Sequence, residues 1–262
     1  TKNLPMIVDL KPSGTGYMED LYKAGGSQRI FYELRDFLYL DAKSVNGTTL
    51  GEEIKNSAKW TQNIITNKSN PVFNAGSIAV LKGTLAPNSA IIKQSAATES
   101  LLIHEGRAVV FEGLEDLANR IDRDDLDVTK DDVLVLKSIG PKGGPGMPEA
   151  GLIPIPKKLA KQGVKDMVRI SDGRMSGTAS GTIILHVTPE SHENGPLAIV
   201  ENGDLIKLDV PKRKIDLMIS EEQIAERLLK RKELSIHRRG YNKIYMEHVT
   251  QADKGVDFDF LI

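Results

Sequence analysis

From residue 77 onward, the sequence is a succession of short apolar segments separated by glycine, proline, asparagine and aspartate. Short segments that are rich in β-branched residues and bounded by turn formers predict β-strands. Many short strands with few helices between them favour a closed or nearly closed barrel. The predicted strands cover residues 77–81, 90–93, 107–111, 133–137, 167–170, 182–187, 197–200, 204–209 and 214–218.

The residues between these segments predict turns and flanking helices. Glu201-Asn202-Gly203-Asp204 is the strongest hairpin signal, because an Asn-Gly pair tolerates the positive φ angles of a tight turn. Lys212-Arg213-Lys214, the one basic run, follows Pro211 and is interpreted as a solvated turn. Helical spacing recurs at residues 114–121, 156–161 and 221–231. We therefore predict an α/β chain whose mixed β-barrel is flanked by helices.

The first part of the chain has a different texture. Between Tyr17 and Trp60 the apolar residues recur at helical spacing, with a break at Gly25-Gly26. One face of this helical pair is predicted to hold Leu21, Ile30, Leu34, Phe37 and Leu38. A further short helix is predicted from Glu52, Ile54 and Ala58, with Thr48 or Thr49 as its cap. Residues 61–74 are mostly polar and are interpreted as a connection.

We therefore predict two regions, a helical segment with its linker over residues 1–74 and a barrel domain over residues 75–262. The barrel domain ends in a charged and aromatic arm from residue 236. The aromatic residues of this arm could fasten it to its own barrel or to a neighbouring subunit, and packing on its own barrel is favoured. They are Tyr241, Tyr245, Phe258 and Phe260.

Composition excludes several classes of function. Thirty-five basic residues against 36 acidic ones leave no excess positive charge to neutralise a phosphate backbone, so nucleic acid is not expected as a partner. The absence of cysteine excludes disulfides, thiolate zinc sites, cysteine nucleophiles and a cysteine-ligated iron–sulfur cluster held by this chain alone. It agrees with a reducing compartment, and we expect a cytoplasmic location.

The ends and apolar runs of the chain carry two further expectations. Apolar runs such as residues 133–136 are too short to cross a bilayer, and residues 1–10 lack the pattern of a signal peptide, so no membrane is expected as a partner. The sequence does not open on methionine, which raises the expectation of a longer parent protein.

The first candidate site is a glycine-rich stretch, Gly-Pro-Lys-Gly-Gly-Pro-Gly-Met-Pro-Glu, at residues 140–149. Four glycines and three prolines in ten residues exclude a helix or a regular strand, so this stretch is a shaped loop. It follows a predicted strand and ends on Glu149, whose carboxylate suits a hard cation such as Mg²⁺. A structural turn with a solvated glutamate is an equally good interpretation of this stretch alone.

The second candidate site is the stretch of small residues from 171 to 181, which lies between two predicted strands. Its single arginine, Arg174, could give an anionic substrate a charge-assisted hydrogen bond. Ser176 lies beside Gly177, but the spacing does not match a nucleophile elbow. A hydroxyl-lined turn is the commoner explanation of such a stretch. Of the five histidines, His186 falls in a predicted strand, where a packed or hydrogen-bonded role is favoured over a catalytic one.

Taken together, the two stretches resemble the dihydroxy-acid and sugar-acid dehydratase family. The resemblance rests on residues 140–149 and on Asp-Gly-Arg-Met-Ser-Gly-Thr at residues 172–178. Residues 81–87, 186–190 and 195–198 add further matches, and the likeness runs from about residue 12 to residue 260. Met175, in place of phenylalanine, followed by Thr178-Ala179, is closer to the pentonate and other sugar-acid members.

The resemblance implies a fold and a set of roles. The fold is a carboxy-terminal β-barrel related to the swivelling domain of aconitase-type enzymes, joined to an α/β amino-terminal domain. The family's magnesium-binding glutamate corresponds to Glu149, and its proposed serine base corresponds to Ser176. Thr178, beside this serine, and Arg174 are expected to contact the substrate. The implied reaction is the dehydration of a 2,3-dihydroxy acid, expected to be a sugar acid, to a 2-keto-3-deoxy acid.

The same resemblance implies parts that this chain lacks. The cysteines that hold the family's iron–sulfur cluster and its other Mg²⁺ ligands belong to the amino-terminal domain. We therefore expect this chain to fold but to show no dehydratase activity alone. A homodimer or homotetramer is expected for the whole enzyme. The alternatives are a non-catalytic binding or assembly barrel, the small subunit of an aconitase-like isomerase and, on glycine content alone, a phosphate-binding module.

Overall fold

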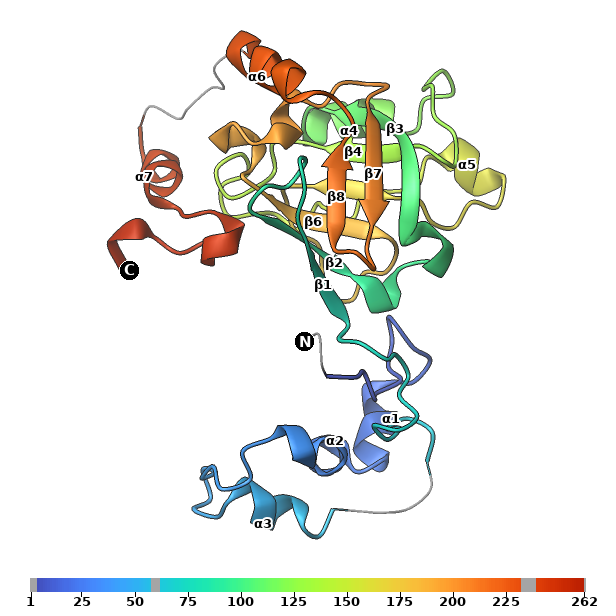
Figure 1. The fold of residues 1–262 in the computed structure, drawn as a ribbon, viewed down its shortest axis with the longest axis vertical. Coiled ribbons are helices and arrows are strands. Elements are labelled where there is room, and N and C mark those ends of the chain that lie inside the picture. The colour runs from blue at the N-terminus through green and yellow to red at the C-terminus, as the bar shows by residue number, and fades with distance from the viewer. Residues whose placement is uncertain (1–3, 58–61, 232–238, 262) are drawn as a thin grey trace. The chain divides into compact units, whose positions relative to one another are not determined.

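The computed structural model describes residues 4–57, 62–231 and 239–261. The chain divides into two compact units, Thr1–Ile78 and Ala79–Ile262, each with its own core. Figure 1 shows the first unit in blue and the second in green to red.

The first unit is helical, as predicted. It contains α1 (Met18–Lys23), α2 (Gly26–Glu33) and α3 (Leu50–Ile54). Thr49 caps α3 by accepting a hydrogen bond from the Glu52 amide at 3.3 Å, while the Glu52 side chain accepts from the Thr49 amide at 2.9 Å. Leu21, Ile30, Leu34 and Leu38 pack into one cluster with Ile7, Ala24 and Ile65.

Two details of the first unit differ from the prediction. Phe37 is 48% exposed and does not join the predicted apolar face, because it lies in a short 3-10 helix that turns it away from the cluster. The predicted connection is not simply a linker, because Ile65 is buried and pairs with Val8, while Phe73 pairs with Met6. Ala58 and Trp60 lie outside the described residues.

The second unit is built on one mixed sheet in the strand order β1-β2-β6-β5-β4-β3-β7-β8. The neighbours β3, β4, β5 and β6 are parallel, whereas β2 pairs antiparallel with β6, β7 with β3, and β8 with β7. The strands are β1 (Ile78–Leu81), β2 (Ser89–Lys93), β3 (Ile103–Phe111), β4 (Val133–Leu136), β5 (Arg169–Ser171), β6 (Ile183–Thr188), β7 (Leu205–Asp209) and β8 (Lys214–Leu217).

The two edges of this sheet meet, which confirms the nearly closed barrel. Lys82, directly after β1, forms a parallel bridge with Lys214 at the start of β8. The Lys82 amide donates to the Arg213 carbonyl at 3.0 Å. Thr84 extends the closure, because its hydroxyl accepts from the Leu217 amide at 2.9 Å. The unpaired edges that an open sheet would expose are therefore bonded to each other here.

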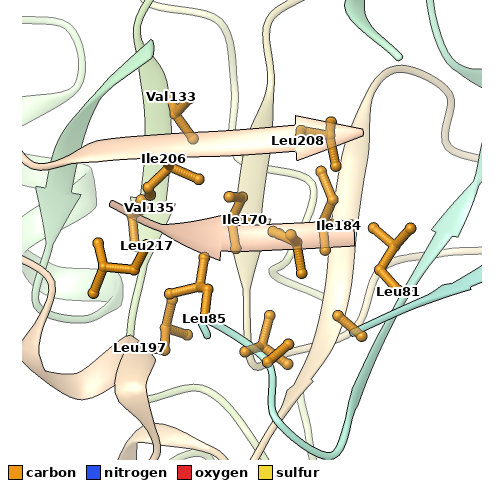
Figure 2. Close-up of a cluster of buried hydrophobic side chains, with 14 of the residues drawn as sticks. Leu81, Leu85, Val133, Val135, Ile170, Ile184, Leu197, Ile206, Leu208 and Leu217 are labelled. Atoms are coloured by element: carbon orange, nitrogen blue, oxygen red, sulfur yellow. The ribbon is translucent and has the colours of Figure 1, made fainter. Parts of the chain in front are cut away.

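Both faces of the parallel strands are buried. Val133 and Val135 of β4 point into the barrel, whereas Leu134 and Leu136 belong to a second cluster with Leu117. Figure 2 shows the interior cluster, to which β1, β4, β5, β6, β7 and β8 all contribute. The outer cluster lies between the sheet and the helices α4 (Leu114–Arg120) and α5 (Lys157–Lys161).

One predicted strand and one predicted hairpin are wrong. Residues 197–200 do not form a strand, since Pro196–Ile199 is a 3-10 helix that begins on a proline without an amide donor for a ladder. The turn at Asn202-Gly203 consequently joins this helix to β7, and no hairpin forms there. The hairpin of this region joins β7 to β8 through Pro211, Lys212 and Arg213, so Lys212 and Arg213 of the basic run lie in a turn as predicted, whereas Lys214 begins β8.

The chain ends with α6 (Glu221–Lys230) and the terminal arm, which carries α7 (Tyr241–His248). The arm packs on its own barrel, as favoured, through Gln251, whose side chain bonds Glu190. Its aromatic residues serve a different purpose from the one predicted, because Phe258 stacks on Phe260 with ring centroids 5.2 Å apart. Tyr245 packs edge-on against Phe258 with ring centroids 5.8 Å apart, whereas Tyr241 is 90% exposed. Among the described residues, no helix has the length and apolar character needed to span a membrane.

Candidate functional site

The candidate site lies at one end of the barrel, the end formed by the carboxyl ends of the parallel strands. Because β3 to β6 are parallel neighbours, their carboxyl ends meet at the same edge, which is where α/β sheets usually build sites. Residues 137–149 follow β4, residues 172–181 follow β5, and residues 189–195 follow β6. Both glycine-rich stretches predicted as sites therefore begin at this edge.

A buried carboxylate, Asp172, joins the three loops. Its side chain is fully buried and accepts hydrogen bonds from the amides of Ile139 at 3.0 Å, Ser138 at 3.3 Å and Ser191 at 2.9 Å. Backbone donors thus replace the water that a carboxylate loses on burial. Asp172 was not among the site residues predicted from the sequence, although an aspartate directly after a buried strand is a signal that could have found it.

A second buried carboxylate, Glu190, supports the glycine-rich loop. It accepts from the Lys142 amide at 2.9 Å and from the Gly143 amide at 2.9 Å. Gln251 of the terminal arm donates to it at 2.6 Å and accepts from its amide at 2.8 Å. Burial raises the pKa of Glu190, and the donated hydrogen bonds oppose that rise. Glu190 entered the prediction from sequence only as part of a matching motif.

The glycines of residues 140–149 are required by close approaches. A Cβ on Gly140 would lie 2.7 Å from a Glu190 carboxylate oxygen, and one on Gly143 would lie 2.7 Å from the Ser138 carbonyl carbon. Gly146 has a φ of +84°, in the left-handed region. The loop is therefore closely packed and restricted in conformation, and Glu149 lies at its carboxyl-terminal end.

The structure brings Glu149 and Arg174 together. An Arg174 Nη1 lies 3.1 Å from Glu149 Oε1, and their side chains are 44% and 47% exposed. Arg174 also donates from Nε to the Met147 carbonyl at 2.7 Å, and its own carbonyl accepts from the Gly151 amide at 2.7 Å. The predicted substrate contact is thus also the residue that fixes the end of the glycine-rich loop.

Ser176 and Thr178 form the other pair. Their hydroxyl oxygens are 2.9 Å apart, and the Thr178 amide donates to Ser176 Oγ at 3.4 Å. Lys93, the last residue of β2, donates from Nζ to the Gly177 carbonyl between them at 2.9 Å. Within the part of the chain that the structure describes, no hydrogen bond or ion pair connects the Ser176–Thr178 pair to the Glu149–Arg174 pair. Lys93 was missed because it is distant in sequence from both loops.

His186 borders the site from β6. The β2–β6 register shifts by one residue between Ser89 and Ile91, and His186 has a φ of +52°. This is a β-bulge with a non-glycine residue in the left-handed region. Its Nδ1 is buried and has no partner among the described residues, so the imidazole is packed but that nitrogen is not hydrogen-bonded. Burial, with a smaller contribution from the Arg174 charge, lowers the pKa of His186.

The predicted residues lie on an open face of the barrel. A hollow of about 430 Å³ lies at the same edge, but its lining includes Glu112, Lys137 and Arg231 and none of the four predicted residues. Glu149, Arg174 and Thr178 are exposed, and Ser176 is half-buried. Across the described ranges, no group of three or more histidine, cysteine, aspartate or glutamate side chains is placed to hold a metal ion. Glu149 fits Mg²⁺ as a single oxygen ligand and not as a complete site.

Comparison with known proteins decides the family. Residues 63–256 match the dihydroxy-acid/6-phosphogluconate dehydratase C-terminal family, and residues 1–53 match its N-terminal counterpart. The chain belongs to this family. The dehydratase match covers both candidate loops and most of the barrel, so the resemblance drawn from these loops is confirmed at the level of the family. It leaves the isomerase-subunit and phosphate-module alternatives without support.

Several relatives are similar to this chain along almost all of its length. A Rhizobium meliloti (strain 1021) protein named as a dehydratase is 49% identical over 261 residues, which are 99% of this chain and 45% of the relative. L-arabinonate dehydratase of Rhizobium leguminosarum bv. trifolii (strain WSM2304) is 44% identical over 99% of this chain and 45% of the relative. L-arabonate dehydratase of Azospirillum brasilense is 43% identical over 100% of this chain and 46% of the relative. The chain thus spans somewhat less than half the length of these relatives.

Proposed function

We propose that this chain is the carboxy-terminal part of a hydro-lyase that dehydrates a 2,3-dihydroxy acid, specifically a sugar acid, to a 2-keto-3-deoxy acid. The observation that carries the proposal is the grouping of Glu149, Arg174, Ser176 and Thr178 in two loops that start from adjacent parallel strands. The names of two relatives, both arabinonate-type dehydratases, support the sugar-acid class.

Ser176 is the proposed base. In its ionised form it takes the proton from C2, and the electron pair of the broken C–H bond moves toward the substrate carboxylate. Hydroxide then leaves from C3, and together with the proton held on Ser176 it makes the released water. The enol that remains tautomerises to the 2-keto acid. Atoms and charge balance without an oxidant or reductant, and Ser176 is returned to its ionised form.

Arg174 and Thr178 are the proposed substrate contacts. The exposed Arg174 guanidinium can present its planar fork to a carboxylate, which is the group that a sugar acid offers. Thr178 lies against Ser176 and can donate its hydroxyl proton to the ionised serine oxygen. In this arrangement the two residues orient the substrate so that C2 faces Ser176.

Glu149 is the proposed Mg²⁺ ligand of this chain. Its carboxylate is exposed at the end of a packed loop, but Arg174 holds one of its oxygens, so a cation would compete with the guanidinium or use the second oxygen. When bound, Mg²⁺ would stabilise the negative charge that develops on the substrate carboxylate. The remaining ligands, and the cysteines of the iron–sulfur cluster, would come from outside this cysteine-free chain.

The test is turnover by the full-length protein, purified anaerobically with Mg²⁺ and its cluster. A panel of aldonic acids and 2,3-dihydroxy-isovalerate is offered, and the 2-keto acid formed is measured. We expect turnover of an aldonic acid, and we expect Glu149→Gln to need at least about tenfold more Mg²⁺ for half-maximal rate. Turnover of none of these acids, with the cluster present, would contradict the proposal and favour a non-catalytic barrel.

A further inference from the structure

Lys93 is placed beside the candidate base by the path of the second loop. The loop from residue 172 to residue 181 starts at the carboxyl end of β5 and returns to the amino end of the parallel strand β6. Gly173 bonds His186 of β6 through its carbonyl, at 3.1 Å, and Gly181 bonds the Ala96 carbonyl at 2.8 Å. Because β2 pairs antiparallel with β6, the end of β2 lies where the loop returns, and Lys93 is the last residue of β2.

The Lys93 ammonium contacts the backbone between the two hydroxyls. Its Nζ donates to the Gly177 carbonyl at 2.9 Å, and the hydroxyls of Ser176 and Thr178, on either side of Gly177, are 2.9 Å apart. The Ala179 amide donates to the Ser176 carbonyl at 3.0 Å and closes the turn. Lys93 is therefore a cation that bonds the backbone of the turn containing Ser176.

The charge of Lys93 has no counterion in the described chain. Lys93 is half-buried, and no carboxylate among the described residues forms an ion pair with it. Burial lowers the pKa of its ammonium group, because a charged form loses hydration there. A half-buried cation without a counterion favours the appearance of a negative charge nearby, and the interaction is stronger than it would be in bulk water. The carbonyl of Gly177 accepts from one of the three N–H donors of the Lys93 ammonium, and this neutral acceptor does not neutralise the positive charge.

We propose that Lys93 is a positioning residue for Ser176, fixing the turn of residues 176–178 and stabilising the ionised serine oxygen by its positive charge. This inference rests on the proposed function, in which Ser176 removes the C2 proton. A serine hydroxyl is a poor base in water, and proton transfer works best when the base is ionised near the working pH. Thr178 donates a hydrogen bond to the ionised oxygen, and Lys93 supplies a positive charge beside it, since the loop's own Arg174 is paired with Glu149.

The experiment compares Lys93→Met and Lys93→Arg in the full-length holoenzyme over a pH series, with an aldonic acid that the wild type turns over. Lys93→Met removes the charge and keeps a linear side chain, whereas Lys93→Arg keeps the charge. Lys207→Met is the matched control, because Lys207 is also a strand lysine, lies on β7 and forms an ion pair with Glu105 at 3.9 Å, away from the candidate site. Thermal unfolding of each variant checks that the barrel is intact.

We expect Lys93→Met to lower kcat by about tenfold or more, with KM changed by less than about twofold. The acid limb of its kcat/KM profile should move up by about one pH unit, and Lys93→Arg should restore most of that shift. A raised KM with unchanged kcat and pH profile would overturn the inference, since Lys93 would then bind substrate. Unchanged kinetics in Lys93→Met beside an inactive Ser176→Ala would overturn this inference alone, whereas an active Ser176→Ala would overturn the proposed base as well.

Discussion

At the residue scale, the site depends on two kinds of acidic side chain. Asp172 and Glu190 are fully buried and are stabilised by backbone amides, so their charge organises the loops and is not available to a ligand. Glu149 is exposed and is paired with Arg174, so its carboxylate can exchange partners. The same functional group therefore serves as a brace in two places and as a candidate ligand in the third.

Glu190→Gln tests the bracing role. The amide retains the shape but turns one oxygen acceptor into a donor, so we expect it to destabilise the native state at neutral pH by about 1–3 kcal/mol. Burial raises the folded-state pKa of Glu190 above its ordinary value of 4.5, so the native state holds this proton more strongly than the unfolded state. The carboxyl's contribution to stability is thus greatest below 4.5 and falls as pH rises through the raised folded-state pKa.

The measurement is denaturant unfolding of wild type and Glu190→Gln from acid to neutral pH. The difference between the two unfolding free energies should change across the pH interval between the ordinary glutamate pKa of 4.5 and the raised folded-state pKa, since only the wild type loses this proton there. Glu193→Gln is a suitable control, because Glu193 is an exposed neighbour of the same type that pairs with Lys142. A pH-independent difference would show that the Glu190 carboxyl does not titrate differently in the two states.

The sequence was informative about which residues are chemically distinctive, and less so about which residues support them. Glu149 and Arg174 were found because a lone acid and a lone arginine stand out in stretches of small residues. Their 3.1 Å contact could not be predicted, because it depends on how two loops meet in space. Lys93 and Glu190 were missed for the same reason. Each acts through backbone groups of a loop that is distant in sequence.

At the scale of elements, strand positions were well predicted where β-branched residues alternate or run between turn formers. The prediction failed at residues 197–200, where the apolar pattern is sound but Pro196 starts a 3-10 helix. Strand order could not be predicted, because it is set by long-range pairing such as that of β3 with β7. The bulge at His186 could not be predicted either, since an alternating pattern does not show where a strand takes an extra residue.

The bulge makes its own prediction. Because His186 has a φ of +52°, asparagine should be tolerated there better than valine, and we expect His186→Val to be less stable than His186→Asn by about 1–2 kcal/mol. The measurement is the unfolding free energy of both variants. The same two changes at His104, which lies in β3 with no positive φ, are the control and should not favour asparagine in this way. Equal stability of the two His186 variants would contradict a strained bulge.

At the scale of the whole molecule, the chain carries a nearly closed barrel with one candidate site, and a helical unit. The barrel and its flanking helices were predictable from punctuation and periodicity, whereas the closure by Lys82, Thr84 and Lys214 was not. The two regions proposed from sequence, residues 1–74 and 75–262, stay a prediction as functional domains. Residues 1–53 match the N-terminal family, so the first unit is related to the part of the relatives that precedes the barrel.

The open face of the site predicts how the chain behaves alone. Because the described residues offer Glu149 as a single candidate ligand and the chain has no cysteine, we expect the purified 262-residue chain to fold but to give no measurable 2-keto acid from any aldonic acid. The measurement is product formation at high protein concentration with Mg²⁺, beside the full-length enzyme at matched concentration. Turnover by the chain without added protein would contradict the proposed division of the active site.

The central claim is that Ser176 removes the C2 proton, and its most direct test follows that proton. The full-length enzyme and its Ser176→Ala variant are given a C2-deuterated aldonic acid, and loss of the label and formation of the 2-keto acid are measured together. The account predicts that Ser176→Ala lowers both rates by at least about 100-fold while the iron–sulfur cluster and substrate binding are retained. Rates within about twofold of the wild type would contradict it, because another group would then be the base.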